Sequence, residues 1–424
     1  MARGGATEQA AKTTFRDVFA VAEFRALWLA QLLSVAGDQL ARVALTVLVY
    51  DRTRSALLAA VTFVVSVVPM FIGGVTLAWL ADRYPRRRVM IACDLIRAAL
   101  VLIMAVPGMP LVAMVALLFV VTFAGAPFTS ARAAVYPDVL TGDTYLMGTA
   151  VTLTTFQFAQ VLGFAAGGAI VGFFGIQTSL IVDAATFVAS ALIVRAWVRS
   201  RPAALPSAHS GRARRGEPAR VVGVIAGTRL VFANRALRTT MLFGWLAAFY
   251  NGPEGVVTPL ARAVGGGAVA VGAILAAQAL GETAGAIVFS RFVAPSARLR
   301  CMGPLAVATC AVLVLFIFQP DLLDSLLILF ASGLCASYQL AANAAFVRAA
   351  PGEQRSQAFG VAQGGMSLGQ GTVIILAGAV ADHHSPASVI AVCGAVGAVA
   401  ALAIALSWSR DHGHADRHHQ RSRG

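Results

Sequence analysis

Residues 73–97 read GGVTLAWLADRYPRRRVMIACDLIR and place a strongly basic turn between two apolar segments. The first apolar segment ends at Asp82, and apolar sequence resumes after four arginines, namely Arg83, Arg86, Arg87 and Arg88. Such a turn cannot stay in the hydrocarbon of a bilayer, and the positive-inside rule predicts that it lies on the cytoplasmic side. This arginine loop (residues 82–88) therefore predicts the orientation of the other segments.

The composition indicates a helical membrane protein. Hydrophobic residues make up 58% of the 424 residues and charged residues only 12%, with a mean hydropathy of +0.77. Soluble domains have roughly 45–50% apolar and about 25% charged residues. The apolar runs are continuous and about 20 residues long, the length that a helix needs to cross a bilayer. We therefore predict an all-α integral membrane protein.

Interruptions in the apolar pattern predict twelve transmembrane helices. Their expected bounds are 24–50, 55–81, 87–106, 109–134, 146–174, 178–198, 238–260, 267–293, 301–319, 324–347, 357–381 and 387–408. Several connections are only a few residues long, so neighbouring spans are antiparallel. The region 199–237 is the one long polar interruption, and it falls in the middle of the chain.

The basic residues test this topology. With both termini in the cytoplasm, 28 of the 33 Lys and Arg residues fall in or beside cytoplasmic segments. The outer connections hold only Arg52, Arg54 and Arg262. The net charge of +14 is thus explained by topology and anionic lipid headgroups, and we expect no nucleic-acid partner.

The two sides of the central linker echo each other. The tripeptide Arg25-Ala26-Leu27 opens the first span, and Arg235-Ala236-Leu237 opens the seventh. Such echoes favour two parallel six-helix halves. The expected division is an N-terminal cytoplasmic segment, a first half, a linker with a possible surface helix, a second half and a basic, His-rich cytoplasmic tail, at 1–23, 24–198, 199–237, 238–408 and 409–424.

The arginine loop resembles the signature between spans 2 and 3 of the major facilitator superfamily. That pattern runs Gly-x-x-x-Asp-(Arg/Lys)-x-Gly-(Arg/Lys)-(Arg/Lys) and is matched by Asp82, Arg83, Arg86 and Arg87, while its two glycines are Ala78 and Pro85 here. The run LADRYPRRRVMIACDLIRA, the start Phe24-Arg25-Ala26-Leu27-Trp28 and Asp38 look most like the branch of macrolide-efflux and enterobactin-exporter proteins. The resemblance covers about Phe24 to Trp408.

This resemblance implies a twelve-helix plasma-membrane transporter that exports drugs in exchange for protons, a multidrug antiporter. Span 5 is similar to the antiporter motif of drug exporters at Gly163, Gly167 and Gly168. The alternative is ordinary packing, because Gly163 and Gly167 are four residues apart and make a flat helix face.

Ionisable side chains inside spans need a reason, because each costs at least ~2.5–3.5 kcal/mol at the helix centre. Asp38 and Arg42 lie four apart in span 1 and share a face, so Arg42 is the expected charge partner of Asp38. The pair is either a neutral structural unit or a proton-binding carboxylate whose affinity Arg42 sets. Asp94 and Arg97 are expected to hold the arginine loop against neighbouring helices.

Three further carboxylates stand apart. Asp183 lies in the outer third of span 6, where water can solvate it. Glu254 lies in a Gly-Pro-Glu-Gly break, and Glu282 is deep in span 8 with no basic residue near it in sequence. Our candidates for proton coupling are Asp38, Glu282 and Glu254. Polar side chains within spans, such as Gln339 and Gln363, are candidates for substrate contact or interhelical hydrogen bonds.

The loop itself has a predicted mechanical role. A carboxylate at a helix C-terminus opposes the helix dipole, so Asp82 needs a cation such as Arg83 or Arg87. We predict that the residues Asp82, Arg83, Arg86, Arg87, Asp94 and Arg97 form a conformational switch that grips the facing helices when the cavity opens outward.

The sequence indicates no enzyme. Its one lysine, Lys12, lies in no Gly-Lys-(Ser/Thr) phosphate loop. The expected function is proton-coupled export of amphipathic small molecules by a monomer that needs no cofactor or metal, with small-molecule substrate, protons and membrane lipid as partners. The alternatives are an uptake symporter of the same fold and a non-transporting membrane receptor.

Overall fold

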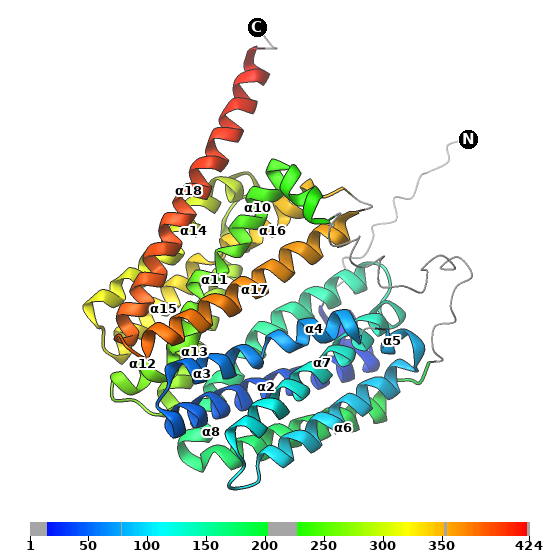
Figure 1. Cartoon of the computed structure of the whole chain (residues 1–424). Coiled ribbons are helices and arrows are strands. Elements are labelled where there is room, and N and C mark those ends of the chain that lie inside the picture. Colours follow the sequence, from blue (N-terminus) through cyan, green and yellow to red (C-terminus); the bar gives the residue numbers. More distant parts are fainter. Residues whose placement is uncertain (1–14, 78, 202–226, 352–353, 422–424) are drawn as a thin grey trace, which may run out of the picture.

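The structure is a computed structural model that describes residues 15–77, 79–201, 227–351 and 354–421. Parts of the predicted N-terminal segment, linker and tail, together with Ala78, lie outside these residues. The first half lies below the second in Figure 1, where the chain runs from blue to red. Every regular element in the described ranges is a helix.

The first half begins with a short helix, α1 (Phe15–Ala20), and the long α2 (Ala22–Thr53). A broken path follows through α3 (Ala56–Val65), α4 (Val68–Thr76) and α5 (Leu80–Arg83). The chain then continues with α6 (Arg86–Met104), α7 (Leu111–Val139) and α8 (Asp143–Trp197). The helix α7 continues past the predicted end of span 4 at 134, because Pro137 is accommodated within the helix and α7 ends only at Val139.

The helix α8 contains two stretches, 143–174 and 176–197, separated by Gly175. Gly175 has φ of 85° and ψ of 172°, a backbone conformation that glycine adopts easily because it has no Cβ to clash with the chain. Trp28 donates to Thr155 at 2.6 Å in the first stretch, and Glu23 accepts from the backbone of Arg199, just after the second. Both stretches therefore run alongside α2, as the prediction of two spans here requires.

The second half repeats the pattern with more breaks. Residues 227–233 are helical and precede α10 (Arg235–Trp245), α11 (Ala247–Tyr250), the 3₁₀ helix η2 (Gly252–Val256) and α12 (Val257–Ala263). There follow α13 (Ala268–Phe292), α14 (Pro295–Ala311), the 3₁₀ helix η3 (Val312–Phe318), α15 (Leu322–Cys335), α16 (Tyr338–Ala349) and α17 (Arg355–Ala381). The last helix, α18 (Pro386–Arg421), extends past the predicted end at 408, because no proline interrupts it.

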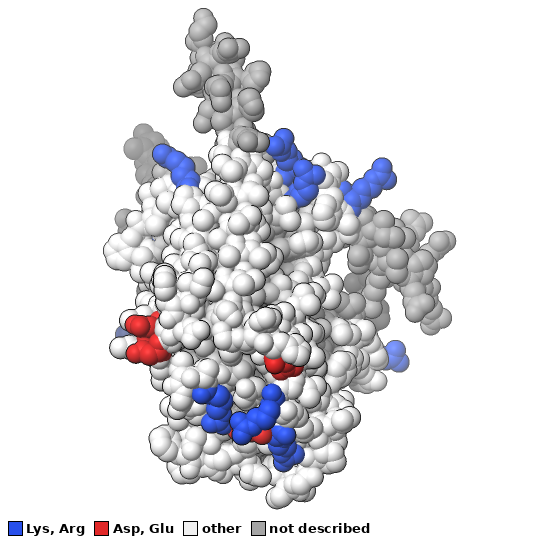
Figure 2. All heavy atoms as spheres, turned by 60° about the vertical axis from the view of Figure 1, so that its left-hand side comes forward, with Lys and Arg blue, Asp and Glu red and all other residues white. Residues whose placement is uncertain are grey.

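Helix length and composition fit a bilayer. Within the described ranges, nine helical stretches are long and apolar enough to cross a membrane. Figure 2 shows charged side chains gathered in a few patches on the visible face, with broad uncharged surface between them. The all-helical membrane fold is therefore as predicted, while the count of twelve spans stays a prediction.

The core reveals how the halves meet. One buried cluster contains residues of both halves, such as Phe63 and Phe164 from the first and Val271 and Ile374 from the second. Towards the arginine loop the buried residues instead form two clusters, one in each half. The halves thus share a core at one end, the closed end, and are separate at the other, the open end.

Candidate functional site

Close backbone contacts join the halves at the closed end. A Cβ on Gly272 of α13 would lie 2.5 Å from the carbonyl oxygen of Phe164, and one on Gly168 of α8 would lie 2.8 Å from the Cα of Gly272. A Cβ on Gly378 of α17 would lie 2.5 Å from the Cβ of Ala60 in α3. Glycine is required here because any side chain would push the halves apart.

Polar contacts surround this packing. Arg262 of α12 donates to both carboxylate oxygens of Asp51 in α2, at 2.8 and 2.7 Å. Asp382, which follows α17, accepts from the Ser55 hydroxyl at 3.0 Å and from the Ala56 amide. Both contacts cross between the halves, and both must break if the closed end is to open.

The arginine loop lies at the open end and is bound within its own half. Arg86 donates to Asp138 and to the carbonyl of Ala134, both at 2.7 Å, and Arg87 donates to the carbonyl of Arg195. Asp82 is exposed, and across the described part of the chain it forms no ion pair within 4 Å. The predicted grip on the facing half is thus not formed in this conformation, and its formation in another one stays a prediction.

Buried charges occupy the middle of the first half. Arg97 of α6 forms an ion pair with Asp38 of α2 and donates to the Ser34 hydroxyl at 3.1 Å. Its guanidinium also lies 4.0 Å from the ring centre of Phe187 in α8. Because the Arg97 side chain is only 3% exposed, it has little water to replace these partners.

Two expectations about these charges are wrong. Asp38 forms its ion pair with Arg97 rather than with Arg42, because the Arg97 side chain extends from α6 to Asp38 in α2. Asp94 and Arg97 do not hold the arginine loop. Asp94 instead accepts a hydrogen bond from Ser190 of α8 at 2.6 Å and is fully buried.

Arg42 lies nearer the boundary between the halves. Its guanidinium lies 5.2 Å from the ring centre of Phe63 and 5.9 Å from that of Phe164, and it donates to the carbonyl of Ser66 at 3.3 Å. Its Nε is buried without a hydrogen-bond partner. The carboxylates whose charges act on it most strongly are Glu254, from the second half, and Asp38.

Asp183 is buried, contrary to the expectation that water solvates it. It is 1% exposed, and within the described ranges neither carboxylate oxygen has a hydrogen-bond partner of normal geometry. The reason is Gly37: a Cβ there would lie 2.4 Å from an oxygen of Asp183, so α2 and α8 approach each other directly over the carboxylate. The positive charge that acts on it is that of Arg97.

The second half contributes Glu254 and Glu282. Glu254 lies in η2, the break that the sequence predicts, and Glu282 lies midway along α13. The negative charges of these two residues act on each other. Next to them, Gln278 bridges to the carbonyl of Tyr250 at 3.2 Å and to the side chain of Asn251 at 2.8 Å. The middle of the protein therefore carries ionisable groups from both halves.

A pocket of about 390 Å³ lies beside this region, between α10, α16 and α17. Its polar lining includes Gln339, Asn343 and Gln363, and its apolar lining includes Phe359 and Met366. Trp245, also in the lining, is fixed by donating to the carbonyl of Ala362 at 2.9 Å. Mixed linings of this kind suit amphipathic molecules.

A sequence profile described as Major Facilitator Superfamily matches residues 27–258 and 255–423. The chain belongs to this superfamily. A bacterial homologue of the human lysosomal transporter Spinster, inward-facing and unoccupied, superposes with a TM-score of 0.63 at 14% identity, over 93% of this chain and 95% of that one. No curated protein matches the chain.

Two further solved transporters share the fold. A transporter of the POT family in complex with 5-aminolevulinic acid has a TM-score of 0.71 at 10% identity, over 94% of this chain and 98% of its own. A nucleoside transporter has a TM-score of 0.66 at 15% identity, over 91% and 99%. As a superfamily member, this chain is a membrane transporter rather than an enzyme.

The sequence analysis did not identify Asp51 and Asp382, which form polar contacts between the halves at the closed end. Both are acidic residues at the ends of spans, and this position indicates only a side chain that water solvates. The outer arginine Arg262 could have signalled them, because it is one of few positive charges on its side.

Proposed function

We propose that this transporter exports amphipathic small molecules in exchange for protons, by alternating access. The observation that carries the proposal is the placement of ionisable residues from both halves in the middle of the fold. Arg42 of the first half interacts electrostatically with Glu254 of the second, and one helical turn away on α2 Asp38 forms an ion pair with the buried Arg97. A structural scaffold would have no need of such costly groups.

The proposed coupling step begins at Asp38. Its side chain is 31% exposed, so water and protons can reach it from the open end, whereas Arg97 is almost fully enclosed. A proton on Asp38 neutralises the carboxylate and weakens its hold on Arg97. The guanidinium can then turn to Asp183, whose carboxyl is neutral while Arg97 stays on Asp38 and releases its proton as the new ion pair forms. Because Asp183 lies on α8, this exchange replaces an ion pair between α6 and α2 with one between α6 and α8.

Glu254 and Glu282 are the proposed second proton site. Both belong to the half that lines the pocket, and Glu254 is attracted electrostatically by Arg42 of the other half. When Glu254 is protonated, this attraction between the halves is lost. The two sites thus connect protonation with both the internal arrangement of the first half and its contact with the second.

The proposed substrate site is the pocket between α10, α16 and α17. Its glutamine and asparagine side chains offer hydrogen bonds, and its aromatic and methionine side chains offer apolar contact. The resemblance to macrolide-efflux and enterobactin-exporter proteins supports export and a drug-like or siderophore-like substrate. With the arginine loop in the cytoplasm, the open end faces inward and receives substrate from the cell, as a monomer in the plasma membrane with both termini inside.

Transport in proteoliposomes tests the proposal. The purified protein is reconstituted and given a macrolide, a catecholate siderophore or an amphipathic cationic dye, with and without an imposed pH gradient. We expect gradient-driven movement of at least one of them, opposite in direction to the proton flow. Movement in the same direction as the protons would establish an uptake symporter, and no movement of any compound would contradict the proposal.

A further inference from the structure

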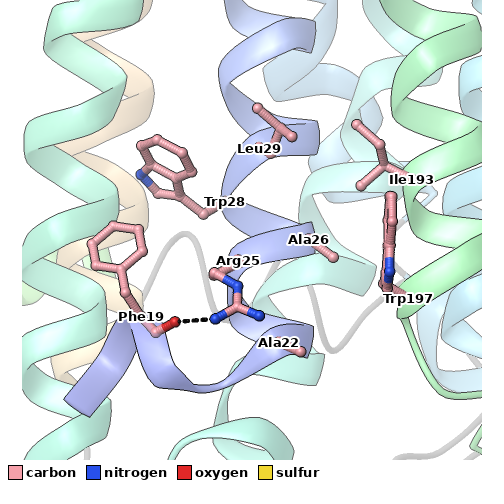
Figure 3. A pocket seen from close by; sticks show the side chains of 8 residues that line it. All are labelled: Phe19, Ala22, Arg25, Ala26, Trp28, Leu29, Ile193 and Trp197. Atoms are coloured by element: carbon pink, nitrogen blue, oxygen red, sulfur yellow. Dashed lines mark hydrogen bonds between the residues drawn. The ribbon is translucent and has the colours of Figure 1, made fainter. Parts of the chain in front are cut away.

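A surface pocket separate from the transport pathway lies at the open end of the first half. It measures about 390 Å³ and is formed by α1, the start of α2 and the end of α8, with no contribution from the second half. Figure 3 shows Arg25 at its centre, Phe19 and Trp28 on one side and Ile193 and Trp197 on the other. We propose that this pocket binds the phosphodiester headgroup of an anionic phospholipid.

The chemistry of the lining divides along the membrane normal. Trp28 and Trp197 stand near the ends of α2 and α8, where aromatic side chains favour the headgroup level of a bilayer. Leu29 follows Trp28 in α2, and Ile193 lies about one helical turn before Trp197 in α8. Both are farther from the helix ends than the tryptophans and offer an apolar wall. A lipid has this same order, with a polar headgroup above and acyl chains below.

Arg25 supplies the charge that the headgroup needs. One of its terminal nitrogens donates to the carbonyl of Phe19 at 2.7 Å, which fixes the guanidinium in the pocket. Its other donors remain for a ligand, and within the described ranges it forms no ion pair. Arginine suits a phosphodiester because its planar guanidinium offers two parallel donors to the oxygens.

The carboxylate nearest to Arg25 in sequence does not neutralise it. Glu23 is occupied by Arg201, which donates to its two oxygens at 2.5 and 2.9 Å, and by the backbone amide of Arg199 at 2.9 Å. The pocket therefore keeps a net positive charge towards the bilayer. The cytoplasmic leaflet, where the predicted topology places it, is the leaflet that carries anionic lipid.

The aromatic residues also fix the shape of the site. Trp28 is held by its hydrogen bond to Thr155 of α8 and by an edge contact with Phe19, with ring centres 5.3 Å apart. Trp197 is 58% exposed and forms the outer wall. Because its sides are anchored on different helices, a lipid seated there would tie α1 and α2 to the end of α8.

Quenching of tryptophan fluorescence by brominated lipids tests the proposal. Of the five tryptophans, Trp28 and Trp197 line the pocket, so the variant W79F/W245F/W408F leaves them as reporters. The protein is reconstituted in phosphatidylcholine with a minor fraction of phosphatidylglycerol, and the bromines are placed on one lipid or the other. The two samples contain the same mole fraction of brominated lipid. We expect brominated phosphatidylglycerol to quench as if it were enriched about fivefold around the two tryptophans, the effect of one basic residue at an anionic surface.

Three variants decide whether Arg25 is responsible. R25Q should remove the preference, and R25K, which keeps the charge, should retain part of it. R291Q removes an exposed arginine from α13 in the other half and should leave the preference intact. Equal quenching by both lipids, or a preference that survives R25Q, would overturn the proposal. So would displacement of the lipid by inorganic phosphate at constant ionic strength, which would assign the pocket to a soluble anion.

Discussion

The carboxylate of Asp382, at the end of α17, accepts a hydrogen bond from the backbone amide of Ala56, the first residue of α3. The same carboxylate accepts from the hydroxyl of Ser55, which itself caps α3 by accepting from the amide of Leu58. An acid of the second half thus completes the N-terminal cap of a helix in the first half. Helix N-termini attract negative charge, so this contact stabilises the conformation in which the two halves meet at the closed end.

Removal of this carboxylate should open the closed end. Hydrogen bonds to a charged group contribute about 1.5–3 kcal/mol, so D382A should shift the equilibrium by about one to two orders of magnitude. The measurement uses V64C, because Val64 faces Gly371 across the interface, in a variant without the five native cysteines. Labelling by an impermeant maleimide from outside should accelerate in D382A.

The matched control is D51N. Asp51 also contacts the other half, but its pair with Arg262 is about one-third exposed, and such pairs contribute ~0–1 kcal/mol. Labelling should therefore change less in D51N than in D382A. Equal or slower labelling in D382A than in the parent would refute the capping role.

Substitution of Gly168 should prevent closure of this end. The side chain of G168L has no room against Ala268 and Gly272 of α13, so the variant should stay open to the outside, lose transport and label faster at V64C. G364A is the control, since a Cβ on Gly364 of α17 meets nothing within 4 Å. If G168L transports normally, the contact between α8 and α13 is not the closing surface.

Asp82 should matter for transport and not for assembly. It is exposed and has no ion-pair partner among the described residues, so D82N should insert and fold normally, and should slow transport because the opposite conformation lacks its grip. Transport rate and membrane expression are measured together. Either normal transport or failed expression would reduce the arginine loop to a determinant of topology.

Asp183 and Arg97 should differ sharply in their effect on stability. The unpartnered Asp183 oxygens imply a neutral side chain, because a buried charge without partners is strongly unfavourable. D183N therefore should melt within a few degrees of the parent. R97L leaves Asp38 and the buried Asp94 without their cation and should lose ~3–5 kcal/mol. Thermal unfolding in detergent measures both, and a severe loss in D183N would show that Asp183 is ionised.

The helical membrane fold follows from the sequence because a bilayer imposes length and apolarity on every span. The break at Glu254 was also readable, since Gly252, Pro253 and Gly255 surround it. The cap of α3 by Asp382 joins residues 326 apart in sequence, and no local pattern encodes such a contact.

Pairing of the buried charges could not be read from helix spacing alone. Asp38 and Arg42 do share a helix, but Arg97 reaches Asp38 from α6, 59 residues away. Burial of Asp183 depends on Gly37, whose missing side chain is visible in the sequence while its position against α8 is not. Tertiary packing thus decides which of several possible partners each charge finds.

Proton coupling through Asp38 is the central claim. One assay distinguishes a loss of proton coupling from a loss of substrate movement. Proteoliposomes containing wild type or D38N are tested for pH-gradient-driven accumulation and for counterflow, which exchanges labelled for unlabelled substrate without a gradient. D38E, which keeps the charge, controls for folding. We predict that D38N loses gradient-driven accumulation and keeps counterflow, and that D38E keeps both. Gradient-driven accumulation by D38N at the wild-type level would contradict the account.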